Sequence, residues 1–428
     1  MNNIILIIGY VWPEPNSSAA GSRMLQLIQF FLQQQCRVIF ASAANLSEHR
    51  VDLPVLGVEE KTIALNCSSF DAYLAELQPD LVVFDRFFTE EQFGWRVATT
   101  CPQALRVLNT EDLHSLRQVR QQILKRQQQS ATSEADRFQL YPPAVDAALL
   151  FDAMAADDMA QRELAAIYRC DISLIISRVE YELLHNEFAV PAALLHYCPF
   201  LLQPQGLPEQ TFEQRNDFVT IGNFRHEPNW DAVLCLKHQI WPRLRARLPH
   251  AQLRIYGAYP PPKATALHNP RQGFYIGGWA EDAMQVMQQA RVCLAPLRFG
   301  AGLKGKLIDA MQCGTPSVTT SIGAEGLHGQ DHWPGAIADN LDPFVEAAVE
   351  LYESPEHWQR AHQQCAAQLQ PFAADQLIPL LSKKLEETKA GLETHRRRNF
   401  IGAMLQHHQH KSTQYMSLWI EAKNRSTP

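Results

Sequence analysis

The sequence predicts an α/β protein made of two domains. At 428 residues, the chain is longer than a single hydrophobic core usually supports. Short apolar runs alternate with helical stretches, and this pattern occurs twice along the chain. A polar, proline-rich segment, Pro199–Pro208, separates the two sets and is the best candidate for a linker. Because strands that alternate with helices form parallel sheets, we expect two Rossmann-like domains facing each other across a cleft.

In the first set, short apolar runs bounded by Pro or polar residues predict five buried strands. These strands are expected at Ile4–Ile8, Arg37–Ala41, Leu81–Phe84, Ala104–Leu108 and Ile172–Ile176. Helices are expected at Gly21–Gln34 and Val179–Glu187. Residues 113–169 are rich in Gln, Ala, Glu and Arg and predict long helices, with a break at Tyr141-Pro142-Pro143 because proline removes an amide donor.

The second set begins with a strand that ends in a glycine turn, Gly222-Asn223-Phe224. Its strands are expected at Phe218–Ile221, Gln252–Tyr256, Phe274–Ile276, Val292–Ala295 and Ser317–Thr320. In open α/β sheets, ligands bind at the carboxyl ends of the strands. We therefore expect the cleft to be lined by the segments Gly9–Gly21, Asp85–Phe88, Asn109–Arg117, Gly222–Asn229 and Phe299–Lys306.

Composition narrows the class of protein. A formal charge of -7 gives no general electrostatic basis for nucleic-acid binding. The nine cysteines contain no CxxC pair, so they indicate reduced core thiols rather than disulfides or a zinc site. The apolar run Ile4–Ile8 is too short for a signal peptide or a membrane span, and no Lys or Arg precedes it. We therefore expect a cytoplasmic protein.

The segment Phe299–Leu327 is the most informative part of the chain. Gly300-Ala301-Gly302 is followed at once by Lys304 and Lys306, and a helical run then leads to a β-branched strand. Backbone amides and ammonium groups gathered at a helix N-terminus suit a phosphate or pyrophosphate. The alternative is that both lysines simply face solvent. The turn after the first strand, Gly9-Tyr10-Val11-Trp12-Pro13, is not GxGxxG, which disfavours a dinucleotide-dependent oxidoreductase.

Residues 218–327 resemble the donor-binding half of bacterial GT-B glycosyltransferases of the family 4, or glycosyltransferase group 1, type. The matching pieces are FVTIGNFRHEPNWDAV, IWPRLRARLPHAQLRIYG and APLRFGAGLKGKLIDAMQCGTPSVTTSIGAEGL. In the first half, LNTEDLHSLRQVR and QRELAAIYRCDISLIISRVEYELL are similar to the acceptor-side domain of the same group. The resemblance implies the GT-B fold. It also implies domains at 1–205 (acceptor side), 206–385 (nucleotide-sugar donor) and 386–428, a helical extension that returns to the first domain.

For the donor side, the resemblance implies that Gly300, Gly302 and one or both of Lys304 and Lys306 neutralise the diphosphate of a nucleotide sugar. Asp309 replaces the family's ribose-binding Glu, and Ala301 stands where the larger branch of the family has a second Glu. The remaining donor-binding candidates are Arg225, Asn229, which replaces a common Lys, and Glu325.

On the acceptor side, the resemblance makes His114 the best catalytic candidate, with Asp112 beside it. Their role is to orient the donor sugar or the incoming hydroxyl. Arg117 and Gly21 are the further candidates for the cleft. Asp112 and Arg117 fit equally well a helix cap and an exposed salt bridge.

The C-terminal stretch contains His407, His408 and His410 without nearby carboxylate or Cys partners, so a metal site is not expected there. The arginines at 396–398 suit either a solvated helix face or contact with an anionic acceptor or membrane surface.

The expected function is a metal-independent transfer of a sugar from a nucleoside-diphosphate sugar to a hydroxyl acceptor, with retention implied by the resemblance. The expected acceptor is a hydroxyl of a carbohydrate, a lipid-linked molecule or a protein. The reaction would belong to surface polysaccharide or glycoconjugate synthesis. The protein is expected in the cytoplasm or at the inner face of the membrane as a peripheral protein. Two alternatives stay open. One is a nucleotide-sugar-binding protein without catalysis, which Ala301 and Asp309 favour, and the other is a nucleotide-sugar epimerase of the same fold.

Overall fold

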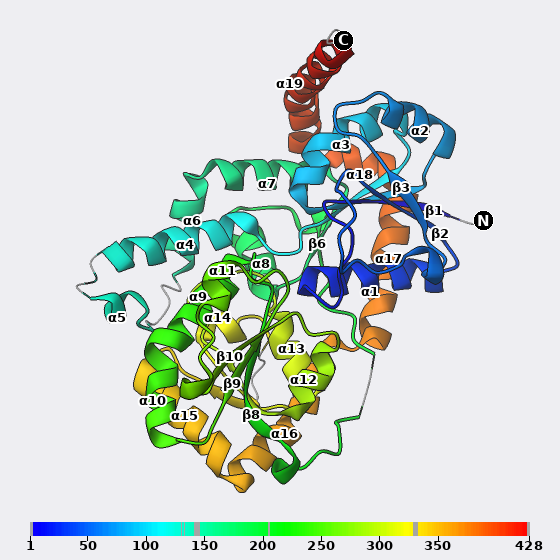
Figure 1. The fold of residues 1–428 in the computed structure, drawn as a ribbon. Coiled ribbons are helices and arrows are strands. Elements are labelled where there is room, and N and C mark those ends of the chain that lie inside the picture. The colour runs from blue at the N-terminus through cyan, green and yellow to red at the C-terminus, as the bar shows by residue number, and fades with distance from the viewer. Residues whose placement is uncertain are drawn as a thin grey trace.

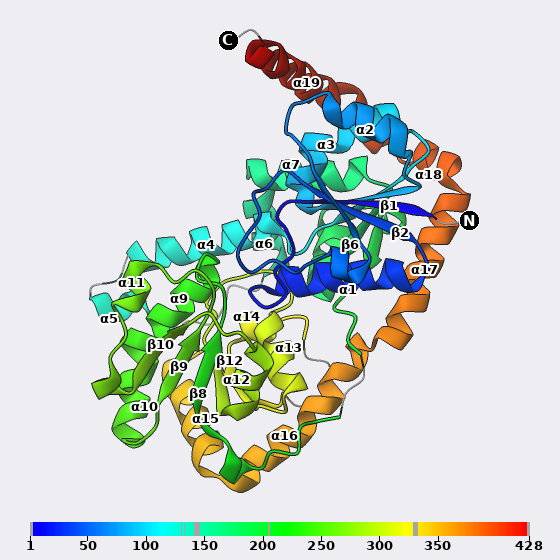
Figure 2. The same ribbon diagram turned by 45° about the vertical axis from the view of Figure 1, so that its right-hand side comes forward.

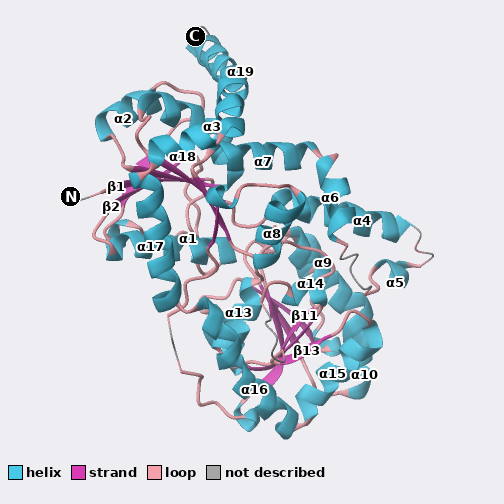
Figure 3. Ribbon diagram, turned by 180° about the vertical axis from the view of Figure 1, so that it is seen from behind, coloured by secondary structure: helices cyan, strands magenta, loops and turns pink. Residues whose placement is uncertain are grey.

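A computed structural model describes residues 3–129, 131, 133–140, 146–203, 206–327 and 333–425. It contains two sheets in which every strand pair is parallel, and helices cover both sheets (Figure 1). Figure 3 shows the same two helix-covered sheets from behind. The predicted α/β class and the two Rossmann-like domains are confirmed.

The first sheet has seven strands in the order β3-β2-β1-β4-β5-β6-β7. The strands are β1 (Ile4–Gly9), β2 (Arg37–Ser42), β3 (Glu59–Thr62), β4 (Leu81–Asp85), β5 (Leu105–Asn109), β6 (Ile172–Ile175) and β7 (Leu195–Tyr197). Its helices are α1 (Ala19–Gln33), α2 (Ser69–Leu77), α3 (Arg86–Thr100), α4 (His114–Gln129), α5 (Glu134–Arg137), α6 (Ala147–Ala155), α7 (Asp158–Arg169) and α8 (Arg178–Glu182). The five predicted strands are all present, whereas the two edge strands β3 and β7 were not predicted. The predicted break at Tyr141-Pro142-Pro143 lies outside the described residues.

The second sheet has six strands in the order β10-β9-β8-β11-β12-β13. The strands are β8 (Asn216–Ile221), β9 (Leu253–Tyr256), β10 (Phe274–Gly278), β11 (Ala290–Ala295), β12 (Ser317–Thr319) and β13 (Gly335–Ile337). Its helices are α9 (Glu227–Cys235), α10 (Trp241–Arg247), α11 (Pro262–Thr265), α12 (Ala283–Gln289), α13 (Gly305–Gln312), α14 (Ser321–Ala324), α15 (Leu341–Glu353) and α16 (Pro355–Leu369). Short 3₁₀ segments occur at η1 (Pro54–Leu56), η3 (Ala192–Leu194), η4 (Phe212–Gln214), η6 (Pro270–Gln272) and η7 (Gln370–Phe372), and π segments at η2 (Leu183–Glu187) and η5 (Leu236–Ile240).

Helix α1 illustrates how sequence spacing produces the layers. Met24, Leu27, Ile28 and Phe31 recur at intervals of three and one, which places them on one helical face, and all four are buried against the first sheet. Each buried side chain of this size contributes about 1.5–3 kcal/mol relative to exposure. The Ser18 side chain caps the helix by accepting from the Gly21 amide at 3.0 Å.

The chain crosses between the domains twice. After β7 it enters the second domain, and it returns through η7, where the Leu202 amide donates to the Phe372 carbonyl and the Ala374 amide to the Leu202 carbonyl, both at 2.8 Å. The last helices are α17 (Ala374–Ala390), α18 (Leu392–Arg398) and α19 (Phe400–Arg425).

Helix α17 packs on the first domain, although the domain bounds implied by the resemblance placed its residues up to 385 in the second domain. Leu381 and Leu385 of α17 belong to the same buried cluster as the β1 residues Ile5 and Ile7. The return crossing therefore lies near residues 370–373, because the apolar face of α17 completes the core of the first sheet. Figure 2 shows α17 and α18 running along this domain.

Helices α18 and α19 also lie on the first domain. Arg396 donates to both carboxylate oxygens of Asp171 at 2.7 Å, and Arg96 of α3 donates to the Ser417 hydroxyl of α19 at 3.0 Å. Within the described ranges, no helix has both the length and the apolar character needed to cross a membrane.

Candidate functional site

Loops from the two domains touch where β5 and β11 end. The loop after β5 carries Asp112, and the loop after β11 carries Gly302, whose φ of 63° is left-handed. A Cβ added to Gly302 would lie 2.8 Å from the Cβ of Asp112, so a larger residue has no room there. Glycine is required at this position both for its backbone conformation and for this close approach.

Glu180 of α8 joins these two loops. One of its carboxylate oxygens accepts from the Gly302 amide at 2.7 Å and from the Leu113 amide at 3.1 Å. Burial raises the pKa of Glu180 to about 8, and the negative charge of Asp112 adds to this rise. The Gly302 amide is therefore occupied by a protein carboxylate. Sequence reasoning missed Glu180; its signal was a carboxylate just after a buried strand.

Arg120 and Glu325 form a second connection between the domains. The Arg120 guanidinium donates to both Glu325 oxygens at 2.8 and 2.6 Å and to the Gly300 carbonyl at 2.8 Å. Glu325, a candidate for donor binding, is thus held in a buried ion pair. Arg120 was missed, although it follows Arg117 by three residues on the same face of α4.

Lys304 is only 8% exposed, and its ammonium donates to the Gly302 carbonyl at 2.7 Å. Burial lowers the pKa of Lys304, while the carboxylates of Glu325 and Glu180 oppose this change. Its charge therefore balances the carboxylates that join the two domains.

Lys306 and Asp309 lie three residues apart in the first turns of α13. The Lys306 ammonium donates to the Asn229 side chain at 2.8 Å. Burial lowers the pKa of Lys306 to about 8 and raises that of Asp309 to about 7, and each opposes the shift of the other. Asn229 is itself held by donating to the Asn223 carbonyl at 3.0 Å. Lys306 is thus a cation at a helix N-terminus, and its pKa lies closer to neutral pH than that of an ordinary lysine.

The N-terminus of α13 has no side-chain cap. The amides of Gly305 and Lys306 in its first turn have no partner within the helix, and the helix dipole adds partial positive charge there. A Cβ on Gly305 would lie 2.6 Å from the Cβ of Ala19, so the first turns of α1 and α13 are in contact. Gly21 serves packing, because a Cβ there would meet the Glu14 carbonyl oxygen at 2.3 Å.

Arg225 precedes Asn229 by four residues, and its side chain is exposed. Its guanidinium stacks on the Tyr259 ring at 3.7 Å from the centroid, and the Tyr259 hydroxyl donates to Glu14 at 2.8 Å. Because Glu14 belongs to the first domain, this stack also spans the interface.

On the first domain, Asp112, His114 and Arg117 lie together at the start of α4. Burial alone would raise the pKa of Asp112, but Arg117, which donates to its carboxylate, and the neighbouring His114 and His226 outweigh burial and hold this pKa below its usual range. The His114 Nδ1 lies 3.1 Å from the Asp112 carbonyl oxygen, and its ring packs edge-on against Phe87 and Phe88.

His226, at the N-cap of α9, faces this cluster from the second domain and was missed by sequence reasoning. Although its side chain retains an exposed surface, enclosure by surrounding protein and the charges of Arg117 and Lys306 lower its pKa. Gln121 of α4 donates to Glu227 next to it, so α4 and α9 are in direct contact. The only signal for His226 was its position after a strand and before Glu227-Pro228.

The structure brings together most of the predicted residues: Asp112, His114, Arg117, Asn229, Gly302, Lys304, Lys306 and Asp309. We call this set the interface site. Gly300 and Glu325 are engaged with Arg120, Arg225 stacks on Tyr259, and Gly21 is a packing residue. In the described ranges, no group of three or more His, Cys, Asp or Glu is arranged to hold a metal ion.

Comparisons with solved structures identify the fold. Anabaena HepE, in complex with UDP and glucose, has a TM-score of 0.61 at 12% identity over 89% of this chain and 99% of its own. Sucrose-phosphate synthase from Thermosynechococcus elongatus has a TM-score of 0.57 at 14% identity, covering 91% and 100% of the two chains. The predicted GT-B architecture is thereby confirmed.

A variant of S. aureus TarM, in complex with Fondaparinux, α-GlcNAc-glycerol and UDP, has a TM-score of 0.55 at 11% identity and covers 74% of this chain. The chain spans 58% of the length of TarM.

In sequence, residues 215–354 match the family model of Glycosyl transferases group 1, which confirms the resemblance read from the motifs. No curated protein matches the chain in sequence.

Proposed function

We propose that the protein transfers a sugar from a nucleoside-diphosphate sugar to a hydroxyl acceptor, and that the interface site performs this reaction. One observation carries the proposal: the uncapped N-terminus of α13 and the Lys306 cation lie beside Asp112 and His226, which come from opposite domains. The group 1 match of the second domain and the UDP-bound neighbour HepE support it.

In this reaction, the bond between the anomeric carbon and the phosphate oxygen breaks, and its electron pair leaves with the nucleoside diphosphate. The acceptor oxygen forms the new bond to that carbon, and its proton passes to the departing phosphate oxygen. The leaving diphosphate gains negative charge, so cations and amides fixed in advance stabilise the transition state. In this proposal Lys306 and the first amides of α13 supply this stabilisation. Arg225, two residues before α9, is a further candidate for contact with the phosphates, and Asp309 is the candidate to accept from ribose hydroxyls.

The opposite domain orients the sugar and the acceptor. Asp112 stays ionised because Arg117 donates to it, and His114 is fixed by the Asp112 carbonyl and by two phenylalanine rings. These groups therefore suit positioning of the transferred sugar. We propose that transfer retains the anomeric configuration and needs no metal ion.

The test is a panel of nucleotide sugars incubated with the purified protein, with release of nucleoside diphosphate as the readout. A ligand at a hundred times its dissociation constant should add about 2.7 kcal/mol of apparent stability, which a thermal-shift assay detects. Proton NMR of the product reports the anomeric configuration, and activity undiminished by EDTA would support metal independence. Lack of both binding and turnover with every donor would contradict the proposal.

The absence of a carboxylate at position 301 favours a second candidate, a nucleotide-sugar-binding protein without catalysis. Ala301 is buried in the core of the first domain and offers no hydrogen bond to a sugar. Stable binding of a donor with neither hydrolysis nor transfer would support this candidate, whereas conversion of donor without acceptor would indicate an epimerase.

We further propose that the acceptor belongs to surface polysaccharide or glycoconjugate synthesis and that α19 contacts a membrane surface from the cytoplasmic side. Seven large apolar residues of α19 are exposed: Phe400, Ile401, Met404, Tyr415, Met416, Leu418 and Trp419. By helical periodicity they face away from the buried Ser417 and Glu421. Co-sedimentation with phosphatidylglycerol vesicles should fall severalfold in a Tyr415→Ser/Trp419→Ser double variant; equal sedimentation of both proteins would contradict this contact.

A further inference from the structure

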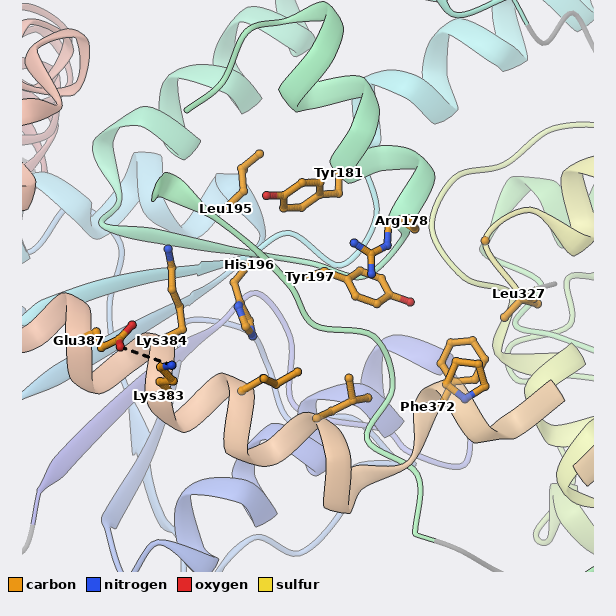
Figure 4. A pocket seen from close by; sticks show the side chains of 14 residues that line it. Arg178, Tyr181, Leu195, His196, Tyr197, Leu327, Phe372, Lys383, Lys384 and Glu387 are labelled. Atoms are coloured by element: carbon orange, nitrogen blue, oxygen red, sulfur yellow. Dashed lines mark ion pairs between the residues drawn. The ribbon is translucent and has the colours of Figure 1, made fainter. Parts of the chain in front are cut away.

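A cavity of about 580 Å³ lies beside the two chain crossings (Figure 4). Its walls come from α8, β7, η7, α17 and the second-domain residues Gly326 and Leu327. Arg178 lines this cavity, whereas Glu180, two residues further along α8, contacts Gly302. Residues two apart on a helix point in different directions, so the cavity is separate from the interface site.

The charges that line the cavity are mostly positive. Arg178, Lys383 and Lys384 contribute three cations, and Glu387, 3.9 Å from Lys383, is the one carboxylate among the lining residues. Lys384 donates to the Ala193 carbonyl at 2.8 Å. The Arg178 guanidinium lies 4.3 Å from the Tyr197 ring centroid and forms no ion pair within the described part of the chain. This excess of positive charge, in a chain whose net charge is -7, favours an anionic ligand.

Between the cations the walls are apolar. Leu195, Leu377, Leu380 and Phe372 line the cavity, and Figure 4 shows Arg178 toward one end and the two lysines toward the other. Leu380 is 57% exposed, so much of its apolar surface is in contact with water. An inorganic anion would leave this surface in water, and an uncharged hydrocarbon would leave the cations without a partner.

We propose that this cavity binds an anion with a hydrocarbon body, of the class of alkyl phosphates and alkyl carboxylates. The anionic group lies against Arg178, and the hydrocarbon chain covers Leu377 and Leu380. The proposal does not depend on the sugar-transfer reaction, because none of these residues belongs to the interface site.

The test is isothermal titration of the full chain with decyl phosphate and decanoate below their micellar concentrations, in the presence of saturating UDP. Decyl phosphate or decanoate should bind at least tenfold more tightly than decanol or inorganic phosphate. The tighter of the two identifies the headgroup as phosphate or carboxylate. Equal binding of decanol would overturn the anionic part of the proposal, and equal binding of inorganic phosphate would overturn its hydrocarbon part.

Two variants locate the site. Arg178→Ala and Leu380→Asp, both at exposed positions, should each weaken binding about tenfold. The first variant removes a charge-assisted contact, and the second replaces an apolar contact by a carboxylate that repels the anion. Arg398→Ala and Trp419→Ala, outside the cavity, are the matched controls. Loss of binding in Trp419→Ala with none in Arg178→Ala would place the ligand on α19 and overturn the proposal.

Discussion

At the scale of single residues, burial shifts the pKa values of charged groups in the interface site away from their ordinary values. Lys306 and Asp309 are the clearest pair, because burial moves the pKa values of both toward neutrality. Within the described part of the chain, the Lys306 ammonium donates one hydrogen bond, to the neutral Asn229 side chain, and forms no ion pair. A diphosphate would supply the anionic partner that this ammonium lacks. The residue-scale predictions therefore concern Lys306.

Replacing Lys306 by alanine should lower kcat/KM for a nucleotide-sugar donor at least tenfold. This factor corresponds to a loss of about 1.4 kcal/mol of transition-state stabilisation. Initial rates of nucleotide release measure it, with Arg247→Ala, an exposed cation of α10, as the control for removal of a charge from the same domain. Equal rates in the wild type and in Lys306→Ala would exclude this lysine from the phosphate site.

The pH dependence of nucleoside-diphosphate binding should also report Lys306. Its pKa in the folded protein is about 8, so the ammonium is protonated below pH 8 and loses its charge as the pH rises further. Affinity for the nucleoside diphosphate should therefore fall severalfold between pH 8 and pH 9.5. In Lys306→Arg the charge persists to far higher pH, so this fall should be absent. Titration calorimetry at four pH values compares the two proteins, and parallel declines would contradict the assignment.

At the scale of secondary-structure elements, sequence pattern predicted the buried strands and the edge strand β10, and it missed the edge strands β3, β7 and β13. β1 and β4 are continuous apolar runs because helices cover both faces of the sheet. β3 reads EEKT and lies at an edge, so its side chains carry no apolar signal. β7 and β13 have only three residues each, too few to show a period.

Helix α17 shows why the domain boundary could not be predicted. Its charged surface and apolar stripe are compatible with packing on either domain, and only tertiary contacts decide. Since Leu381 is 1% exposed and its neighbour Leu380 is 57% exposed, a matched pair of variants is available. Leu381→Ala should lower the free energy of unfolding by about 2–5 kcal/mol, and Leu380→Ala by less than about 1 kcal/mol.

Hydrogen exchange then shows where stability is lost. In Leu381→Ala, protection should fall in β1 and β2, whose residues share the buried cluster with α17, and should be unchanged in β8 and β9. Loss confined to the second sheet would mean that α17 belongs to that domain in solution.

At the scale of the whole molecule, the motifs predicted which loops meet, but not the contacts that fix them. Sequence placed Asp112, Gly302 and Lys306 at strand ends, and topology alone brings such ends together. The pairing of Arg120 with Glu325, and of Glu180 with the Gly302 amide, depends on how the two domains face each other, which no local pattern records. Glu325 therefore received a role in donor binding, although its carboxylate is held by Arg120.

The ion pair between Arg120 and Glu325 should make the two domains unfold together. Both side chains are nearly fully buried, and removal of one partner leaves an uncompensated charge that costs about 3–5 kcal/mol. Arg120→Ala should therefore separate one thermal transition into two, resolved by calorimetry.

In a double-mutant cycle with Glu325→Ala, the double variant should be less destabilised than the sum of the single variants, because neither charge is then left alone. Additive effects would mean that the pair is not formed in solution. Since Arg120 also holds the Gly300 carbonyl, the same variant should raise KM for the donor, and a saturating nucleoside diphosphate that binds the interface site should partly restore the single transition.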